Sequence, residues 1–185
     1  MTARPPAWPT AAPLTTPRLS LEPLRADHAP EAVSVFDDVR LHTWTGGSPR
    51  SLAQLEARYA RQSAGRSPDG TQGWLNWMAR RTSDGLLIGT VQATLDRRPA
   101  AEGPPAGDAI EAAVAWVVGV DHQGAGYGRE AALAMASWLR AQGVGGLAAY
   151  IRPGHGASEG IARALGLRAS DVVADGEARW SDSGR

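Results

Sequence analysis

A glycine-rich segment at residues 123–128, Gln-Gly-Ala-Gly-Tyr-Gly, carries the clearest chemical signal in the sequence. It follows an apolar run at residues 114–120 and precedes a run of good helix formers that begins at Tyr127. Backbone N–H groups in the first turn of a helix have no intrahelical partner and lie at the positive end of the helix dipole, so they attract an anion. The glycines leave that backbone open to a phosphate. The segment is therefore predicted to bind a diphosphate.

Two other phosphate-binding motifs fit this segment less well. A nucleotide-triphosphate loop needs Gly-Lys-Ser/Thr at its end, whereas Gly128 is followed by Arg129 and Glu130. Residues 126–131 match the G-x-G-x-x-A fingerprint of a dinucleotide fold, but the next predicted strand, at residues 147–151, does not end in the acidic residue that binds a ribose. A nicotinamide oxidoreductase is therefore an alternative of lower rank.

Read as Q-x-x-G-x-G, residues 123–128 resemble the acyl-coenzyme A loop of the GNAT family of N-acetyltransferases. Residues 16–24 resemble the first strand of the ribosomal-protein-alanine acetyltransferase branch, also called RimJ/RimL-like. Residues 155–158, followed by 161–167, resemble the N-x-x-S motif and downstream helix of that branch. The resemblance implies transfer of an acetyl group from acetyl-coenzyme A to a primary amine, of a small molecule or a protein N-terminus, by direct attack and without a metal.

The resemblance and the patterning together imply one α/β domain over residues 14–185. We expect a mixed central sheet of about seven strands, splayed at the acyl-coenzyme A site and flanked by about four helices. Strands are predicted at residues 19–24, 73–81, 86–95, 110–119 and 147–152, and a terminal hairpin turns at Asp175-Gly176. Helices are predicted at residues 27–39, 51–62 and 127–142 and from residue 155 or 158 onward.

Two segments are predicted to lack regular structure. Residues 1–13 contain four prolines and form a disordered Pro/Ala-rich tail, in which Trp8 is expected to be exposed. Residues 41–47 end in two glycines and are expected to form a loop between the first two helices.

The donor site implied by the resemblance combines the glycine-rich turn with the ends of neighbouring elements. Backbone groups of Val117 and Val118 would pair with the pantetheine of the donor like an added strand. Ser158 would donate a hydrogen bond to the departing thiolate, although a serine there could equally cap a helix. His155 stands where relatives usually have asparagine. The predicted donor-binding residues are Val117, Val118, Gln123, Gly124, Ala125, Gly126, Tyr127, Gly128, Arg129, His155 and Ser158.

The acceptor site and the catalytic base are less well marked. Relatives often carry an acidic residue at the position of Ala113, whereas this chain has Glu111 two residues earlier. Residues two apart on a strand share a face, so Glu111 is the candidate base and a candidate to attract an ammonium group, with a solvated strand-end charge as the alternative. His42, Trp44 and Trp77 are the other predicted acceptor contacts. Trp74 and Trp77 should face opposite sides of their strand, so at most one of them lines a pocket.

The amino-acid composition limits the classes of partner that the protein is expected to bind. The chain has 185 residues and a formal net charge of zero, which disfavours nucleic acid as a partner, except as an aminoacyl-tRNA donor. The absence of cysteine excludes disulfides and thiolate catalysis and fits a cytoplasmic protein. No apolar run is long enough for a membrane span. We expect a monomer or homodimer, with another acyl donor or a non-catalytic acyl-coenzyme A-binding regulator as the alternative functions.

Overall fold

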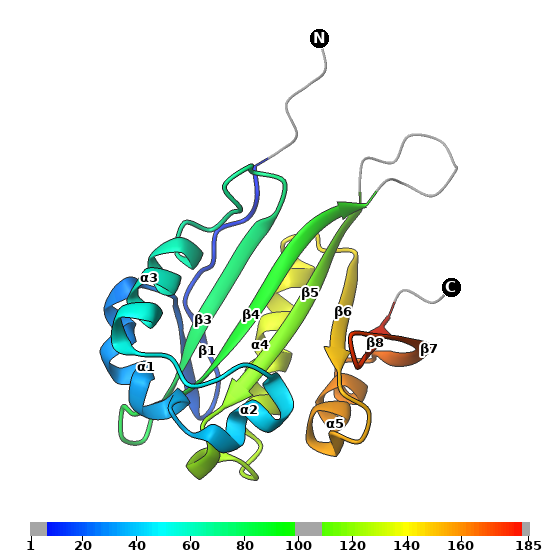
Figure 1. Ribbon diagram of the computed structural model, residues 1–185. Helices are drawn as coiled ribbons and strands as arrows, with labels where there is room; N and C mark the ends of the chain where they lie inside the picture. The colour runs from blue at the N-terminus through cyan, green and yellow to red at the C-terminus, as the bar shows by residue number, and fades with distance from the viewer. Residues whose placement is uncertain (1–6, 99–108, 183–185) are drawn as a thin grey trace, which may run out of the picture.

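The computed structural model describes residues 7–98 and 109–182 of the 185-residue chain (Figure 1). The strands are β1 (Leu14–Thr15), β2 (Leu19–Pro23), β3 (Gly73–Arg81), β4 (Leu87–Arg98), β5 (Ala109–Val118), β6 (Gly146–Ile151), β7 (Arg168–Ala174) and β8 (Glu177–Ser181). The α-helices are α1 (Ala29–Phe36), α2 (Val39–Thr45), α3 (Leu52–Gln62), α4 (Tyr127–Ala141) and α5 (Gly156–Ala164). Short 3₁₀ turns at Ala26–His28 and Val120–His122 precede α1 and α4.

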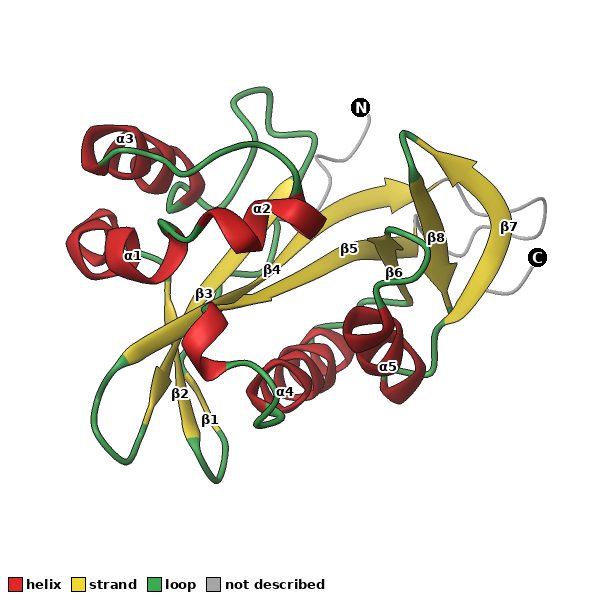
Figure 2. Cartoon of the chain, turned by 60° about the horizontal axis from the view of Figure 1, so that its bottom comes forward, coloured by secondary structure: helices red, strands yellow, loops and turns green. Residues whose placement is uncertain are grey.

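The strands form a single mixed sheet between two layers of helices. Its order is β1-β2-β3-β4-β5-β6-β8-β7, and only the β5–β6 pair is parallel among the described strands. Figure 2 shows α1, α2 and α3 on one face of the sheet and α4 and α5 on the other. Successive residues of β3 pack against the helix layers on opposite faces of the sheet. Trp77 packs in the larger core cluster with Met135 of α4. Met78 packs with Leu55 and Tyr59 of α3.

The sheet divides where β5 meets β6. The two strands pair only through the register from Glu111 opposite Gly146 to Ala113 opposite Ala148. Beyond Ala113, β5 continues to Val118 beside β4, whereas β6 pairs with β8. The predicted splay of the central strands is therefore confirmed, in an α/β sheet that has eight strands rather than about seven in the described part of the chain.

The segment predicted as a loop at residues 41–47 is instead mostly helical. The Asp38 carboxylate caps α2 by accepting a hydrogen bond from the Arg40 amide at 2.8 Å. Gly46 and Gly47 have positive φ angles of 71° and 76°, so they end this helix rather than keep the whole segment irregular. With α2 the described part holds five α-helices rather than about four, and none of them is long and apolar enough to cross a membrane.

Residues 7–13 lie along the domain, in contrast to the disordered tail predicted for residues 1–13; residues 1–6 lie outside the described residues. The Trp8 indole donates a hydrogen bond to the Gly70 carbonyl at 3.1 Å, and the Arg97 guanidinium lies 4.4 Å from its ring centre. The Trp77 indole donates to the Ala12 carbonyl at 2.7 Å. These contacts cover the ends of β3 and β4, and Trp8 is half-buried rather than exposed.

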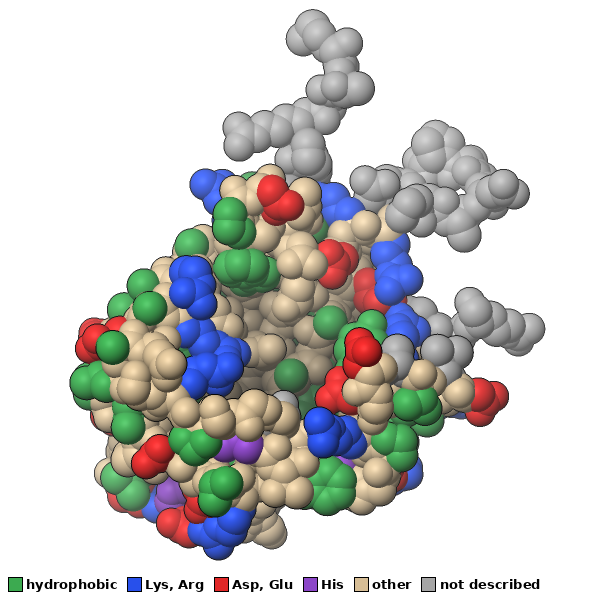
Figure 3. Space-filling view, viewed as in Figure 1, with side chains coloured by type: hydrophobic (Ala, Val, Ile, Leu, Met, Phe, Trp, Pro, Cys, Tyr) green, Lys and Arg blue, Asp and Glu red, His purple; other side chains and the backbone are tan. Residues whose placement is uncertain are grey.

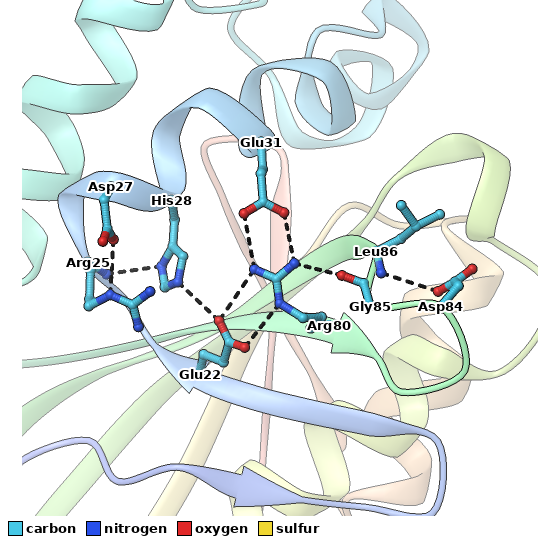
Figure 4. A network of polar contacts seen from close by, with 9 residues as sticks. All are labelled: Glu22, Arg25, Asp27, His28, Glu31, Arg80, Asp84, Gly85 and Leu86. Carbon is cyan, nitrogen blue, oxygen red and sulfur yellow. Dashed lines mark hydrogen bonds and ion pairs between the residues drawn. The ribbon is translucent and has the colours of Figure 1, made fainter.

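A polar network joins α1 to the edge of the sheet (Figure 4). Arg80 of β3 donates to Glu22 of β2 at 3.0 Å, to Glu31 of α1 at 2.8 Å and to the Gly85 carbonyl at 2.7 Å. His28 accepts from the Arg25 amide through Nδ1, so its Nε2–H donates to Glu22. Burial alone would raise the pKa of Glu22, but the hydrogen bond and charge of Arg80, together with the contact from His28, outweigh it and lower that pKa.

We expect Arg80→Met to destabilise the protein by about 1–3 kcal/mol at neutral pH, because it leaves partly buried carboxylate oxygens without their charged donor. Since the folded-state pKa of Glu22 is lowered, its stabilisation is present above the unfolded-state pKa and disappears as the pH falls through the folded-state value. The difference between wild type and variant should therefore shrink in acid. Urea unfolding at neutral and acidic pH measures both effects. Arg66→Met, at an exposed position outside the ion pairs of the described residues, is the control.

Candidate active site

A cleft of about 470 Å³ lies on the sheet face that carries α2 and α3. Its floor is built from cross-strand neighbours: Asn76 of β3 pairs with Gln92 of β4, which pairs with Ala115 of β5, and Thr94 pairs with Ala113 in the next row. These side chains share one face because each strand alternates its side chains between the two faces. The cleft therefore has a polar floor that ends at the fork between β5 and β6.

Helix α2 crosses the mouth of this cleft and contacts the far wall. The Trp44 indole stacks on the His155 imidazole, with ring centres 4.4 Å apart and planes 22° apart. Arg152, directly after β6, donates to the Thr43 carbonyl at 3.3 Å. Burial lowers the pKa of His155, which keeps its imidazole neutral at neutral pH. The structure thus brings together His42, Trp44 and His155, which all line the cleft.

Ser158 lies in the first turn of α5, where its hydroxyl faces the Trp116 indole. The Trp116 Nε1–H donates to Ser158 Oγ at 3.3 Å. The residue preceding α5 is His155, so Ser158 is the third helical residue and not the cap that the sequence left open. Because the oxygen accepts from Trp116, the hydroxyl proton is available to a group in the cleft. Sequence reasoning missed Trp116, whose pattern is that of an ordinary strand residue.

His42 lines the cleft and has one buried ring nitrogen without a hydrogen-bond partner. Its Nδ1 lies 3.1 Å from the Gly46 carbonyl oxygen, which only accepts hydrogen bonds, so Nδ1 carries a proton. Its Nε2 is buried and has no hydrogen-bond partner. A buried nitrogen without a partner is costly. In the neutral ring this nitrogen can accept a proton, and a group in the cleft reaches it once the side chains that cover it shift.

The open edge of β5 is formed by alternate backbone groups. The Gly119 amide donates to the Ile88 carbonyl on β4 at 2.8 Å. By the alternation of an antiparallel ladder, Val118 directs its amide and carbonyl away from β4, and Val117 directs its own toward β4. The backbone edge predicted from Val117 and Val118 is therefore supplied by Val118, while Val117 lines the cleft. The Gln123 side chain donates to the Val118 carbonyl at 2.9 Å, which fixes the turn against the strand.

The glycine-rich turn leads directly into α4, as predicted. Gly124 and Gly126 have positive φ angles of 79° and 83°, and a Cβ added at Gly124 would point into open space. Gly126 precedes the helix without a side-chain cap, so the first amides of α4 are free to bind an anion. This cradle fits the diphosphate of a coenzyme A donor, and exposed Arg129 lies in its first turn. Gly128 has another role, because its Cβ would meet Ile161 and Val118 at 3.3 Å.

Arg18 also contacts the glycine-rich turn, and the sequence did not predict this contact. It forms an ion pair with Glu130 of α4 at 2.6 Å, donates to the Ala125 carbonyl at 2.9 Å and lies 4.7 Å from the Tyr127 ring centre. A Cβ added at Gly126 would lie 3.5 Å from its guanidinium. Arg18 therefore ties β2 to the turn and places a cation beside it. The sequence signal for Arg18 was its position next to Pro17, within residues 16–24, which resemble the first strand of the family.

Glu111 does not lie among the residues that line the cleft, in contrast to the prediction. It shares a sheet face with Ala113, as expected from their spacing, but its carboxylate is held by two arginines. Arg98 lies 2.7 Å away and Arg179 2.8 Å away, and the Glu111 side chain is only 11% exposed. The two guanidinium groups offset the charge of this carboxylate and occupy its oxygens, so it attracts an ammonium group only weakly.

Trp77 is likewise not an acceptor contact. It is fully buried, and its ring meets Trp138 of α4 edge-on at 5.4 Å, on the face of the sheet opposite the cleft. Trp74 lies on the other face of β3 and lines a cavity of about 580 Å³ next to the cleft. The prediction that the two rings face opposite sides is thus confirmed, whereas the choice of Trp77 is wrong.

Comparison with known proteins agrees with this geometry. A family model of the acetyltransferase (GNAT) domain matches residues 18–168. A protein from Bordetella pertussis described as a GNAT-family acetyltransferase is 28% identical, with a TM-score of 0.62 over 92% of this chain and 97% of that one. An acetyltransferase of Agrobacterium tumefaciens is 21% identical, with a TM-score of 0.64 over 97% and 98% of the two chains.

A third solved structure is that of RimL, a ribosomal L7/L12 α-N-protein acetyltransferase in complex with coenzyme A. It is 11% identical, with a TM-score of 0.68 over 94% of this chain and all of that one. At such low identity the last two likenesses show the fold alone. A search of the curated proteins finds no match. Because the family model covers most of the sequence, the chain belongs to the GNAT acetyltransferase family.

Proposed function

We propose that the protein transfers an acetyl group from acetyl-coenzyme A to a primary amine, of a small molecule or a protein N-terminus, by direct attack. One observation carries this proposal. The fork between β5 and β6 joins the free amides at the start of α4 to a cleft that holds Ser158 and His42. A donor thioester and an acceptor amine can therefore meet at the end of β5 from opposite faces of the sheet.

Each group in this proposal has one role. The α4 amides and Arg18 bind the donor diphosphate, and the Val118 edge pairs with its pantetheine. The amine nitrogen forms the new bond to the thioester carbon while the carbon–sulfur bond breaks. Ser158 donates a hydrogen bond to the departing thiolate, and His42 Nε2 accepts the proton that the amine loses. His155 and Trp44 border the acceptor.

The same site is compatible with two alternative functions. A non-catalytic acyl-coenzyme A-binding regulator is favoured by one observation, the neutralisation of Glu111 by Arg98 and Arg179. A different acyl thioester or an aminoacyl-tRNA would replace acetyl-coenzyme A as donor. The RimJ/RimL-like branch, a cytoplasmic location and a monomeric or homodimeric state also stay predictions.

The proposal is tested by incubating the purified protein with acetyl-coenzyme A and a panel of amines, with release of the coenzyme A thiol as the readout. Mass spectrometry of the amines identifies the product. The chain contains no lysine, so acetylation of the enzyme itself is confined to its N-terminal amine and adds little background. Tight coenzyme A binding without turnover of any amine would favour the regulator.

We expect Ser158→Ala to lower the rate of the chemical step about 10- to 100-fold, because the thiolate then leaves without a hydrogen-bond donor. Donor affinity should change less than twofold, since the hydroxyl acts on charge that develops only during the reaction. Single-turnover kinetics and calorimetry separate these quantities. Ser34→Ala, on an exposed face of α1, is the matched control. A loss confined to thermal stability would show that Ser158 is structural.

A further inference from the structure

Arginine side chains gather on the α3 wall of the cleft. Arg50, just before α3, and Arg58, within it, line both the cleft and the adjoining cavity of about 580 Å³, which Arg61 also lines. Figure 3 shows basic side chains along this rim of the central hollow, whereas the opposite rim carries both acidic and basic side chains. Arg152 adds a cation to the cleft, whose one carboxylate among the described lining residues is Glu177.

Arg58 is half-buried and lacks an anionic partner. Its Nε donates to the neutral Gln62 side chain at 3.2 Å, and within the described residues no carboxylate lies within ion-pair distance of it. Burial, with repulsion from Arg50 as the next cause, lowers the pKa of Arg58. A guanidinium nevertheless stays charged in proteins. An unpaired charge removed from water is unfavourable, so the site would gain from an anion.

Arg58 differs in this respect from several other arginines of the domain, which are paired with carboxylates. Arg18, Arg80 and Arg179 each bind a carboxylate. The missing anion at Arg58 is not the donor diphosphate in the proposed arrangement. That group would lie at the start of α4, on the opposite face of the sheet from α3 (Figure 2).

Neutral donors surround the same position. The Asn76 and Gln92 side chains line both cavities beside Arg58, and the Tyr59 phenol lines the cleft. Burial raises the pKa of Tyr59 to about 12, so its hydroxyl stays protonated and able to donate a hydrogen bond. A guanidinium fork with amide and hydroxyl donors around it matches the geometry of a carboxylate or a phosphate.

We infer that the acceptor is an amine that carries an oxyanion, a carboxylate or a phosphate, and that Arg58 with Arg50 binds this group. The inference rests on the proposed acetyl transfer, since it names the acceptor of that reaction. The positive wall also disfavours a second positive charge nearby, so it favours the neutral form of the amine that must attack. Polyamines and other polycations are poor acceptors for such a cleft.

The test uses acceptor pairs that differ only in the anion. Linear ω-amino carboxylates from glycine to 6-aminohexanoate are compared with their primary amides, phosphoethanolamine with ethanolamine, and a C-terminally amidated tripeptide ending in glutamate with its glutamine twin. We expect wild type to prefer the anionic member at least tenfold in kcat/KM. Arg58→Gln should remove this preference by lowering only the anionic rate, whereas Arg66→Gln should retain it.

A binding measurement keeps the two proposals distinguishable. N-acetylglycine and N-acetylglycinamide are titrated into coenzyme A-saturated protein, so that the donor diphosphate site is already filled. Binding of N-acetylglycine alone, lost in Arg58→Gln, supports the anion site even if no amine is turned over, which would reject only the acetyl transfer. Equal use or equal binding of both members of each pair, or an equal loss for both in Arg58→Gln, overturns the inference while leaving the acetyltransferase proposal standing. Failure of both compounds to bind, with no anionic preference in turnover, also overturns it.

Discussion

Replacing His42 by glutamine is expected to lower kcat about 100-fold or more, with little change in coenzyme A affinity. Glutamine can still donate to the Gly46 carbonyl, but its side chain cannot accept the proton that the attacking amine loses. General-base catalysis by a positioned side chain contributes about 10²- to 10⁴-fold. Steady-state kinetics measure kcat, and calorimetry measures the affinity for coenzyme A.

His122→Gln is the matched control, because this histidine lies in the 3₁₀ turn before α4 and outside the lining of the cleft. It should retain the kcat of wild type. If His42→Gln keeps the wild-type kcat, the proton leaves by another route, such as a water chain. A fall in kcat that is accompanied by an equal loss of thermal stability would mean that His42 positions α2 rather than accepting the proton.

Gly126→Ala is expected to weaken coenzyme A binding at least tenfold. The substituted residue would keep a φ of 83°, which an L side chain adopts only with strain. Its Cβ would also stand beside Arg18 and the first amides of α4, where the diphosphate is proposed to bind. Isothermal titration calorimetry with coenzyme A measures the loss.

Gly143→Ala provides a control on the same helix. Gly143 follows the C-terminal end of α4 with a φ of 86°, and a Cβ added there would point into open space, so alanine meets similar backbone strain far from the turn. Both variants should lose similar stability, about 1 kcal/mol, but Gly143→Ala should bind coenzyme A like wild type. Equal coenzyme A affinity in the two folded variants would place the diphosphate elsewhere.

Local patterns in the sequence were sufficient to predict most of the helices and strands. The capping pattern at Ser51 and Gln54 correctly begins α3, since the two side chains bond reciprocally to each other's backbone. The Asp175-Gly176 turn correctly joins β7 to β8, because both residues adopt positive φ. Helix α2 was missed because seven residues without a marked apolar stripe carry little periodicity, and the two glycines after it suggest a loop.

The site required contacts that no local pattern encodes. Alternation placed Glu111 on the correct face, but its partner Arg179 lies 68 positions away in the sequence. The same alternation separated Trp74 from Trp77 without showing which face would meet α4. Arg58 has the pattern of a solvated helix residue, and only the packing of α3 over the sheet shows that its guanidinium lies in a cleft.

The short pairing between β5 and β6 also leaves few backbone hydrogen bonds between the two parts of the sheet. The unit formed by β6, α5, β7 and β8 joins β5 through a ladder that runs only from Glu111 to Ala113, so its opening breaks few backbone hydrogen bonds. A thioester bound along the open edge of β5 would add contacts between β5 and this unit. Donor binding would then stabilise the connection between the two parts of the sheet and make them unfold more cooperatively. Without the donor, the sheet is less rigid at this position.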